Sequence, residues 1–320
     1  MALAYFLGGG LNERPGMGRE MYERHSSVRR WYAQVGEWTG LSPEWILDAP
    51  SPPEREFRTG VGAIRQAAFV FAVADLLAES GVSPSVVGGI SLGSLIGCCL
   101  AGALDRAALF ALLDRVRNAP PPAPGAPAEA IATVFFPREF DEALLEGPAR
   151  PGVHIAADLG QVRGSDLRLL ILAGYRAALE ELAAEAPGEM VTVLPDHPVA
   201  FHSPLQQPLR DFLEPYIAGM PLRDPAIPIC TGTSDQALRT AKEVRQLFLD
   251  NFTHPVSNGN LMSAMAAEGV RLGLALGPSR FDRVDRAPFP TVRVELPDDL
   301  PEALSAVYDH GIAPTGTAPC

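Results

Sequence analysis

Residues 89–93 form a Gly-Ile-Ser-Leu-Gly pentapeptide between an apolar, strand-like stretch at residues 85–88 and a helix-like stretch at residues 92–100. This pattern is typical of a nucleophile elbow, in which a serine occupies a strained strand-to-helix turn and small residues let the backbone pass closely. A serine in a loop before a helix is often only an N-cap, so the flanking strand and helix are what favour Ser91 as a nucleophile. The pentapeptide therefore predicts an α/β fold and covalent acyl chemistry.

Two further segments agree in order and spacing with such an elbow. Residues 198–205 read Pro-Val-Ala-Phe-His-Ser-Pro-Leu, and the N-terminus carries Phe-Leu-Gly-Gly-Gly at residues 6–10 and Pro-Gly-Met-Gly-Arg-Glu at residues 15–20. Together they make the chain, from about residue 4 to residue 286, resemble the malonyl-CoA:acyl-carrier-protein transacylase family and the acyltransferase domains of polyketide synthases. The resemblance implies an α/β-hydrolase-like large subdomain with a parallel sheet and an inserted ferredoxin-like small subdomain.

The pattern of elements predicts the same organisation. Strand-like and helix-like stretches alternate up to the elbow, which indicates parallel strands buried on both faces. The run Asn-Ala-Pro-Pro-Pro-Ala-Pro-Gly at residues 118–125 cannot continue a helix, and the β-α-β-β-α-β order beyond it is that of a ferredoxin-like unit. We expect a large subdomain at 1–125 and 198–296, a small one at 126–197, and a C-terminal tail at 297–320 whose end is poorly ordered.

Composition limits the classes of function that the chain can have. With 320 residues, 47% hydrophobic and 20% charged, it is typical of a globular protein, and its net charge of −12 argues against binding to nucleic acid. No apolar run is long enough to span a membrane and no signal-type segment is present, so we predict a cytoplasmic protein without a membrane partner. The spacing of its four cysteines fits neither a metal site nor a disulfide framework.

A serine nucleophile needs a neighbouring base, and the chain has only six histidines. A lone histidine is more often structural, but His202 matches the base in the family's Ala-Phe-His-Ser-Pro motif; His197 and His254 are its competitors. In the family a main-chain carbonyl orients this imidazole. The matching segment is residues 251–255, and we assign the carbonyl to Asn251, which also suits a helix C-cap.

The tetrahedral intermediate of acyl transfer needs two hydrogen-bond donors. One is expected to be the backbone amide of Leu92, directly after the nucleophile, and the resemblance assigns the other to the amide of Gly9. Relatives carry glutamine at that place. A glycine still supplies a backbone donor but loses side-chain contacts, and a simple turn at residues 8–10 is an equally good interpretation.

The substrate-binding residues give divided indications. Ile90 replaces the histidine that the family carries before the nucleophile. Family members that select a carboxylated acyl group use an arginine in the next helix, whereas that place falls here on Val116, and a shift to Arg117 rotates the side chain by about 100°. Arg115 and Arg117 also suit a solvated helix C-terminus. Phe201, in contrast, is the residue that malonyl-selective relatives carry beside the base.

Three functions remain open from the sequence. The first is an acyltransferase that moves an acyl group from a CoA or carrier-protein thioester to an acyl carrier protein through an acyl-serine intermediate. The second is a thioester hydrolase that uses the same two residues, and the third is a catalytically silent scaffold. The expected substrates are acyl-CoA and phosphopantetheinyl carrier protein, with no bound cofactor and no metal.

Overall fold

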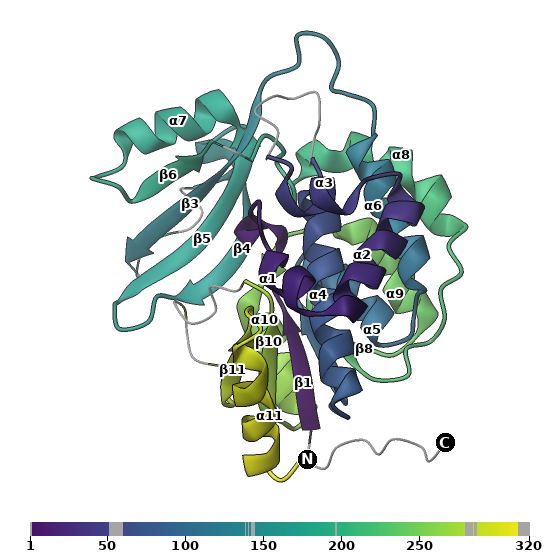
Figure 1. Cartoon of the computed structure of the whole chain (residues 1–320). Coiled ribbons are helices and arrows are strands. Elements are labelled where there is room, and N and C mark those ends of the chain that lie inside the picture. The colour runs from purple at the N-terminus through teal and green to yellow at the C-terminus, as the bar shows by residue number, and fades with distance from the viewer. Residues whose placement is uncertain are drawn as a thin grey trace.

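The structure is a computed structural model that describes residues 2–50, 60–137, 139, 141, 145–195, 197–278, 284 and 287–312. Within these residues the strands form one six-stranded and one five-stranded sheet. Figure 1 shows the smaller sheet beside the larger α/β body, with helix α7 (Arg176–Glu185) on its outer side. Both predicted subdomain types are therefore present, and the predicted fold class is confirmed.

The larger sheet has the strand order β11-β10-β1-β2-β7-β8, and its strands are parallel except for the antiparallel pair β7 and β8. The side chains of β1 alternate strictly. Leu3, Tyr5 and Leu7 pack with the helices, whereas Ala4 and Phe6 face the smaller sheet. The strands are β1 (Ala2–Leu7), β2 (Val86–Gly89), β7 (Ile229–Thr231), β8 (Ser234–Leu238), β10 (Val270–Leu276) and β11 (Thr291–Val294).

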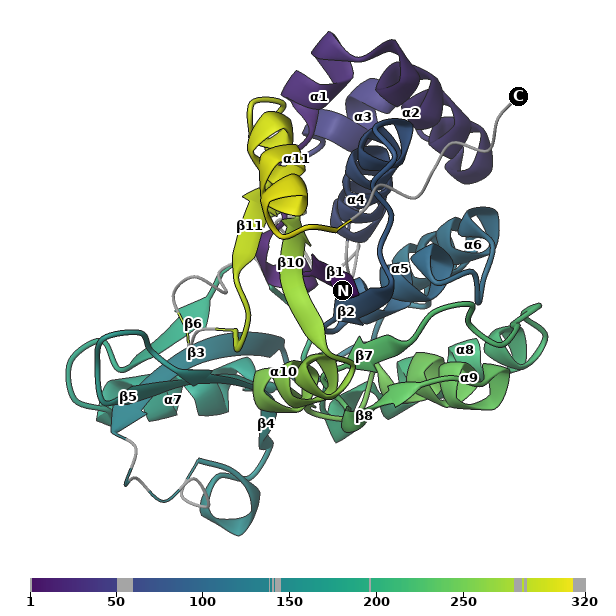
Figure 2. The ribbon, with the colours of Figure 1, turned by 90° about the horizontal axis from the view of Figure 1, so that it is seen from below.

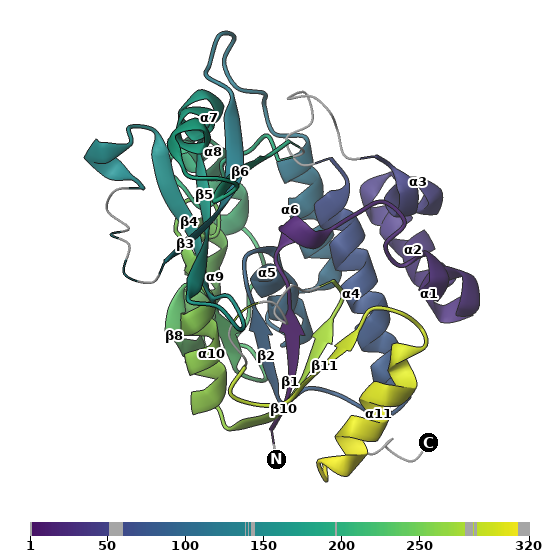
Figure 3. The same ribbon diagram turned by 90° about the vertical axis from the view of Figure 1, so that its left-hand side faces the viewer.

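Helices cover the two faces of this sheet unequally. Figure 3 shows α4 and α5 on one side of β1 and β2 and α10 on the other. Seen from below, α10 lies between the larger sheet and β4 of the smaller sheet (Figure 2). The helices of this body are α1 (Arg19–Arg24), α2 (Ser26–Thr39), α3 (Pro43–Asp48), α4 (Gly62–Glu79), α5 (Leu92–Leu100), α6 (Arg106–Arg117), α8 (Gln207–Ala218), α9 (Ala241–Asp250) and α10 (Asn258–Ala267).

The smaller sheet has the order β6-β3-β5-β4-β9, in which β3, β4, β5 and β6 pair antiparallel in the ferredoxin-like order. Along β3, Ala130, Ala132 and Val134 pack under α7, whereas Ile131 faces the larger sheet. The predicted helix at residues 138–145 lies mostly outside the described residues. The strands are β3 (Glu129–Pro137), β4 (Val153–Gln161), β5 (Leu167–Tyr175), β6 (Val191–Leu194) and β9 (Val256–Ser257).

The segment after residue 296 differs from the expected tail. Helix α11 (Asp299–Asp309) buries Ala303 and Val307 in the main core. The prolines of this segment argued against a helix in the sequence. However, Pro301 lies in the first turn, where a missing amide breaks no intrahelical bond. The last eight residues lie outside the described part, and the predicted subdomain boundaries stay a prediction.

Candidate active site

Ser91 lies in the strained turn that the pentapeptide predicts. Strand β2 ends at Gly89, α5 begins at Leu92, and Ser91 between them has φ 56° and ψ −124°. A Cβ on Gly89 would lie 2.4 Å from the carbonyl carbon of Gly93, and one on Gly93 would lie 2.3 Å from the Leu7 oxygen. Both glycines are therefore required, because the backbone passes too closely for any side chain.

His202 meets Ser91 although the two residues are far apart in the sequence. Its Nε2 lies 2.7 Å from Ser91 Oγ. Among the described residues that are not glycine, only Ser91 and His202 have positive φ, at 56° and 59°. Such backbone conformations cost about 1–3 kcal/mol each and persist where the surrounding structure enforces them, which occurs often at active sites. The predicted nucleophile and base are thus in hydrogen-bonding contact and are both strained.

The environment of His202 keeps its imidazole neutral. The residue is only 8% exposed, and burial lowers its pKa to about 4 because the charged form is desolvated. A hydrogen bond to a main-chain carbonyl opposes this shift only in part. The ring is therefore in the form that can accept a proton from Ser91 at neutral pH.

The carbonyl that orients His202 belongs to His254 and not to Asn251, so our assignment from the sequence was wrong. His202 Nδ1 lies 3.0 Å from His254 O. Asn251 still has helical backbone angles at the end of α9, whereas His254 precedes Pro255, and a proline drives the residue before it out of the helical conformation. Pro255 was therefore the signal in the sequence that identifies the correct carbonyl.

The two expected oxyanion donors flank Ser91. Leu92 is the first residue of α5, and a Cβ on Gly9 would lie 3.4 Å from Ser91 Cβ. The buried Gln66 of α4, which sequence reasoning missed, donates from Nε2 to Gly8 O at 2.8 Å and to Gly9 O at 3.3 Å. Gln66 thus supplies to this loop the kind of side-chain contact that Gly9 itself lacks. The roles of Gly9 and Leu92 as donors stay predictions.

Neither arginine near the end of α6 is free. Arg117 binds Asp114 through Nε and Nη2, at 3.1 and 2.5 Å. The Arg115 guanidinium lies over the Tyr216 ring, 4.7 Å from its centroid, and Val116 is buried in the core. A carboxylated acyl group at this place would share the Arg117 guanidinium with Asp114.

The other two expected substrate-binding residues, Ile90 and Phe201, have apolar side chains. Ile90 is 5% exposed and contacts the small residues of neighbouring loops; a Cβ on Gly232 would lie 3.2 Å from its Cγ1. Phe201 is half-buried against the main core. Both side chains are near the dyad in sequence, but their contact with an acyl group stays a prediction.

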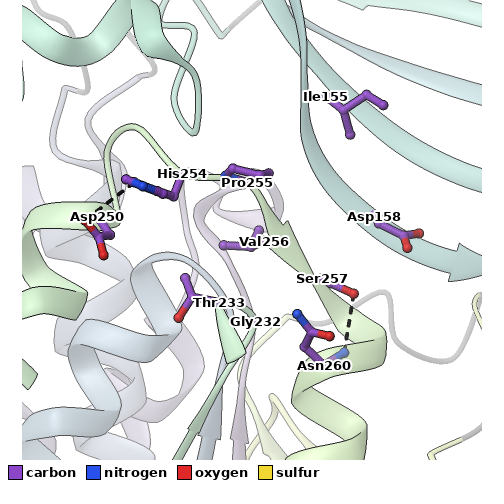
Figure 4. Close-up of a pocket in the computed structure, with 10 residues that line it drawn as sticks. All are labelled: Ile155, Asp158, Gly232, Thr233, Asp250, His254, Pro255, Val256, Ser257 and Asn260. Atoms are coloured by element: carbon purple, nitrogen blue, oxygen red, sulfur yellow. Dashed lines mark hydrogen bonds and ion pairs between the residues drawn. The ribbon is translucent and has the colours of Figure 1, made fainter. Parts of the chain in front are cut away.

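A hollow of about 370 Å³ opens between β4 and the loops that follow β7 and α9 (Figure 4). Its carboxylates are already engaged, since Arg168 binds Asp158 and Gln246 donates to Asp250. Among the described residues, no arginine or lysine lines this hollow. The lining residues are Ile155, Asp158, Gly232, Thr233, Asp250, His254, Pro255, Val256, Ser257 and Asn260.

The described ranges contain neither a metal-binding cluster nor a membrane-spanning helix. In that part of the chain, no three His, Cys, Asp or Glu side chains come together in a way that could hold a metal ion. None of the helices described there is both long and apolar enough to cross a membrane.

Sequence comparison finds relatives among enzymes of polyketide and fatty acid assembly. No protein-family model matches the chain. It is 29% identical to polyketide synthase GfsB of Streptomyces halstedii over 98% of its own length, and 25% identical to non-reducing polyketide synthase CTB1 of Cercospora nicotianae over 82%. It spans only 6% and 12% of these two large proteins. The malonyl CoA-acyl carrier protein transacylase of Bacillus subtilis matches end to end, with 22% identity over 96% of this chain and 98% of the relative.

Solved structures share the fold over nearly the whole chain. The malonyl-CoA:acyl carrier protein transacylase of Helicobacter pylori superposes with a TM-score of 0.81 at 20% identity, covering 97% of this chain and 99% of that one. A malonyl-transacylase in complex with a type II polyketide acyl-carrier protein gives 0.80 at 19% identity, covering 96% and 100%. The resemblance that the sequence motifs indicate is therefore confirmed at the level of the fold.

Proposed function

We propose that this chain, which has the fold of malonyl-CoA:acyl-carrier-protein transacylases, is an acyltransferase that loads an acyl carrier protein in fatty acid or polyketide assembly. The observation that carries the proposal is the 2.7 Å contact between His202 Nε2 and Ser91 Oγ in the strained elbow. The names of the relatives and structural neighbours support the same class of reaction. Its place in the cell stays the prediction made from the sequence.

In the first half-reaction, Ser91 Oγ attacks the carbonyl carbon of an acyl thioester. The hydroxyl proton passes to His202 Nε2, which is free to accept it because the imidazole is neutral. The carbonyl of His254 stabilises the resulting imidazolium through Nδ1. The amides of Gly9 and Leu92 receive the oxyanion, and the thiol leaves with the proton that His202 returns.

In the second half-reaction, the phosphopantetheine thiol of a carrier protein attacks the acyl-serine ester. His202 takes the thiol proton and returns it to Ser91 Oγ, so the enzyme is regenerated by the reverse sequence of steps. Acyl-CoA and the carrier protein enter as substrates, and no bound cofactor takes part in this mechanism.

The proposal covers acyl transfer and leaves out a malonyl clamp at Arg117. Relatives named for malonyl transfer favour that acyl group. However, Nε and Nη2 of Arg117 already donate to one oxygen of Asp114, so its charge is partly compensated before any substrate carboxylate binds. The apolar Ile90 before the nucleophile also favours an uncharged acyl chain.

Mass spectrometry of the intact protein tests the proposal. After mixing with acetyl-CoA or malonyl-CoA, we expect one acyl group on Ser91, which a holo acyl carrier protein removes faster than water. Ser91→Ala abolishes this adduct, whereas Ser85→Ala, a change of the exposed serine that precedes β2, retains it. Rapid loss of the adduct to water alone indicates a hydrolase, and no adduct with any donor indicates a scaffold.

A further inference from the structure

A carboxylate of the smaller sheet reaches across to the turn that carries His202. Glu129 is the first residue of β3 and is half-buried. Its Oε2 accepts a hydrogen bond from the backbone N–H of Ala200 at 3.0 Å and another from Gln206 Nε2 at 2.6 Å. Ala200 and Gln206 are both fully buried, and they lie two residues before and four residues after His202.

Other contacts also hold the turn at residues 200–206, among them the bond from His202 Nδ1 to the carbonyl of His254. His202 has positive φ, and its backbone N–H donates to Phe252 O at 2.8 Å on the side of the larger sheet. Within the turn, Ser203 Oγ donates to Ala200 O at 2.6 Å. Glu129 is thus the support from the smaller sheet, opposite Phe252. A turn with an unfavourable φ keeps its shape only when its neighbours hold it on both sides.

The two bonds are also of a strong kind. A carboxylate acceptor makes hydrogen bonds that are roughly twice as strong as those between neutral groups. Both hydrogen bonds of Glu129 Oε2 go to residues of this turn. Removing the carboxylate would take this acceptor from the buried Ala200 N–H and one hydrogen bond from the Gln206 amide.

We propose that Glu129 is a positioning residue for His202: its carboxylate fixes the turn at residues 200–206 so that the imidazole faces Ser91. The proposal rests on the roles that the proposed function gives to Ser91 and His202. It assigns to the smaller sheet a part in aligning the base. Because small displacements of a catalytic group lower a rate by up to about 100-fold, loss of this contact lowers the reactivity of Ser91 without touching the substrate.

The test measures Ser91 reactivity with phenylmethylsulfonyl fluoride, which needs neither CoA nor carrier protein. Ser91 Oγ forms a bond to sulfur, the sulfur–fluorine bond breaks and fluoride leaves, while the hydroxyl proton passes to His202 and then to water. Mass spectrometry follows the adduct over time at several probe concentrations. This separates the limiting rate constant from the apparent dissociation constant of the probe.

Three substitutions separate the reach of the side chain from its charge. Glu129→Gln keeps the reach and one acceptor, and Gln206 can turn its amide to match, so we expect labelling within about threefold of the unmodified protein. Glu129→Asp keeps the charge but is one methylene shorter, and Glu129→Ala removes the acceptor. For both, we expect the limiting rate constant to fall about tenfold or more, with the apparent dissociation constant unchanged.

Glu146→Ala is the matched control. Glu146 is also half-buried in the small subdomain and accepts a bond from one backbone amide, that of Ile155, at 2.7 Å. We expect it to leave the labelling rate per folded molecule unchanged. Near-ultraviolet circular dichroism gives the folded fraction of each variant, so Glu129→Asp decides the question if Glu129→Ala does not fold.

The outcomes distinguish the two proposals. If Ser91 of the unmodified protein is labelled and Glu129→Asp reacts at the same rate, Glu129 is not a positioning residue and the proposed function stands. If Glu129→Gln is as slow as Glu129→Asp, an acceptor of the same reach does not keep His202 in position, and the inference is wrong. If the unmodified protein is not labelled, or is labelled at another residue, the proposed function itself is wrong.

Discussion

At the scale of single residues, the two residues with strained backbones are also the proposed nucleophile and base. Ser91 and His202 are the two non-glycine residues of the described chain with positive φ, and they contact each other. The surrounding structure supplies the free energy that holds them there, because neither would adopt this backbone conformation alone. The same burial that holds His202 in place lowers its pKa, so geometry and protonation state have one cause.

The low pKa of His202 predicts an unusual pH dependence for acylation. An ordinary histidine with a pKa near 6.5 would be about 90% protonated at pH 5.5 and mostly inactive as a base. His202, with a pKa of about 4, is still neutral there. We expect the single-turnover rate of Ser91 acylation to be flat from pH 8 to pH 5.5 and to fall only as the pH approaches 4, as measured by rapid quench and mass spectrometry.

The sign of the effect on stability follows from the same pKa. Between pH 6.5 and 4 the unfolded chain binds a proton at this histidine and the folded chain does not, so His202 makes the folded state less stable as the pH falls through this window. Circular dichroism at each pH shows that the protein is still folded where the rate is measured. A rate that halves near pH 6.5 with the fold intact contradicts the prediction.

At the scale of elements, the sequence predicts best what local chemistry dictates. The strand, the elbow serine and the helix at residues 86–100 follow from glycine spacing and apolar pattern, and the structure has all three. The contact of His202 with Ser91 was predictable only through a resemblance, since no local pattern joins distant residues. The carbonyl of His254 was missed because the assignment to Asn251 followed the matching family segment and the helix C-cap. Neither of these shows which carbonyl of residues 251–255 reaches the imidazole.

Contacts between elements account for the other omissions. Gln66 lies in the middle of an apolar helix, and nothing in its neighbours along the chain shows that its amide reaches the loop after β1. The pairing of Arg117 with Asp114, in contrast, is an i,i+3 contact within α6, which the sequence spacing permits but does not require. Side chains that act across a gap in the sequence are therefore identified only once the elements are placed.

Gln66 provides a prediction at this scale, because it joins α4 to the loop that carries Gly9. Its Nε2 holds two loop carbonyls, while its Oε1 is buried without a partner among the described atoms. Gln66→Leu removes the unsatisfied acceptor but also leaves the carbonyls of Gly8 and Gly9 without this donor, so we expect the free energy of unfolding to fall by about 1–3 kcal/mol. We expect the rate of Ser91 acylation to fall about tenfold, since a complete oxyanion donor is worth about 100-fold or more.

The control for Gln66 is Gln34→Leu. Gln34 is half-buried on α2, and its side-chain amide donates to the nearby Glu37 at 2.8 Å. Both variants are compared by denaturant unfolding and by single-turnover acylation. An unchanged acylation rate per folded molecule in Gln66→Leu shows that the loop needs no support from α4.

At the scale of the whole molecule, one apolar cluster joins the two sheets. Phe6 and Ile90 of the larger body pack in it with Ile131 and Ile171 of the smaller sheet. Strand β9, which follows His254, pairs with β4 of the smaller sheet and adds backbone hydrogen bonds to this junction. The active-site residues therefore lie where the two bodies share a core, which predicts that the bodies unfold together.

The positions of the tryptophans allow a direct test of this cooperativity. Trp31, Trp38 and Trp45 all lie on α2 and α3 of the larger body, whereas Leu179 belongs to α7 and is fully buried between that helix and the smaller sheet. Leu179→Ala leaves a cavity that costs about 2–5 kcal/mol, and we expect it to lower the midpoint of thermal unfolding by roughly 5 °C. Because the bodies share a core, tryptophan fluorescence should report the same decrease as far-ultraviolet circular dichroism.

Leu213→Ala, in the core of the larger body, is the matched control that moves the fluorescence midpoint in either case. A Leu179→Ala variant whose fluorescence midpoint is unchanged while its circular dichroism develops an earlier transition shows that the smaller sheet unfolds by itself, and the shared cluster then does not hold the active site together.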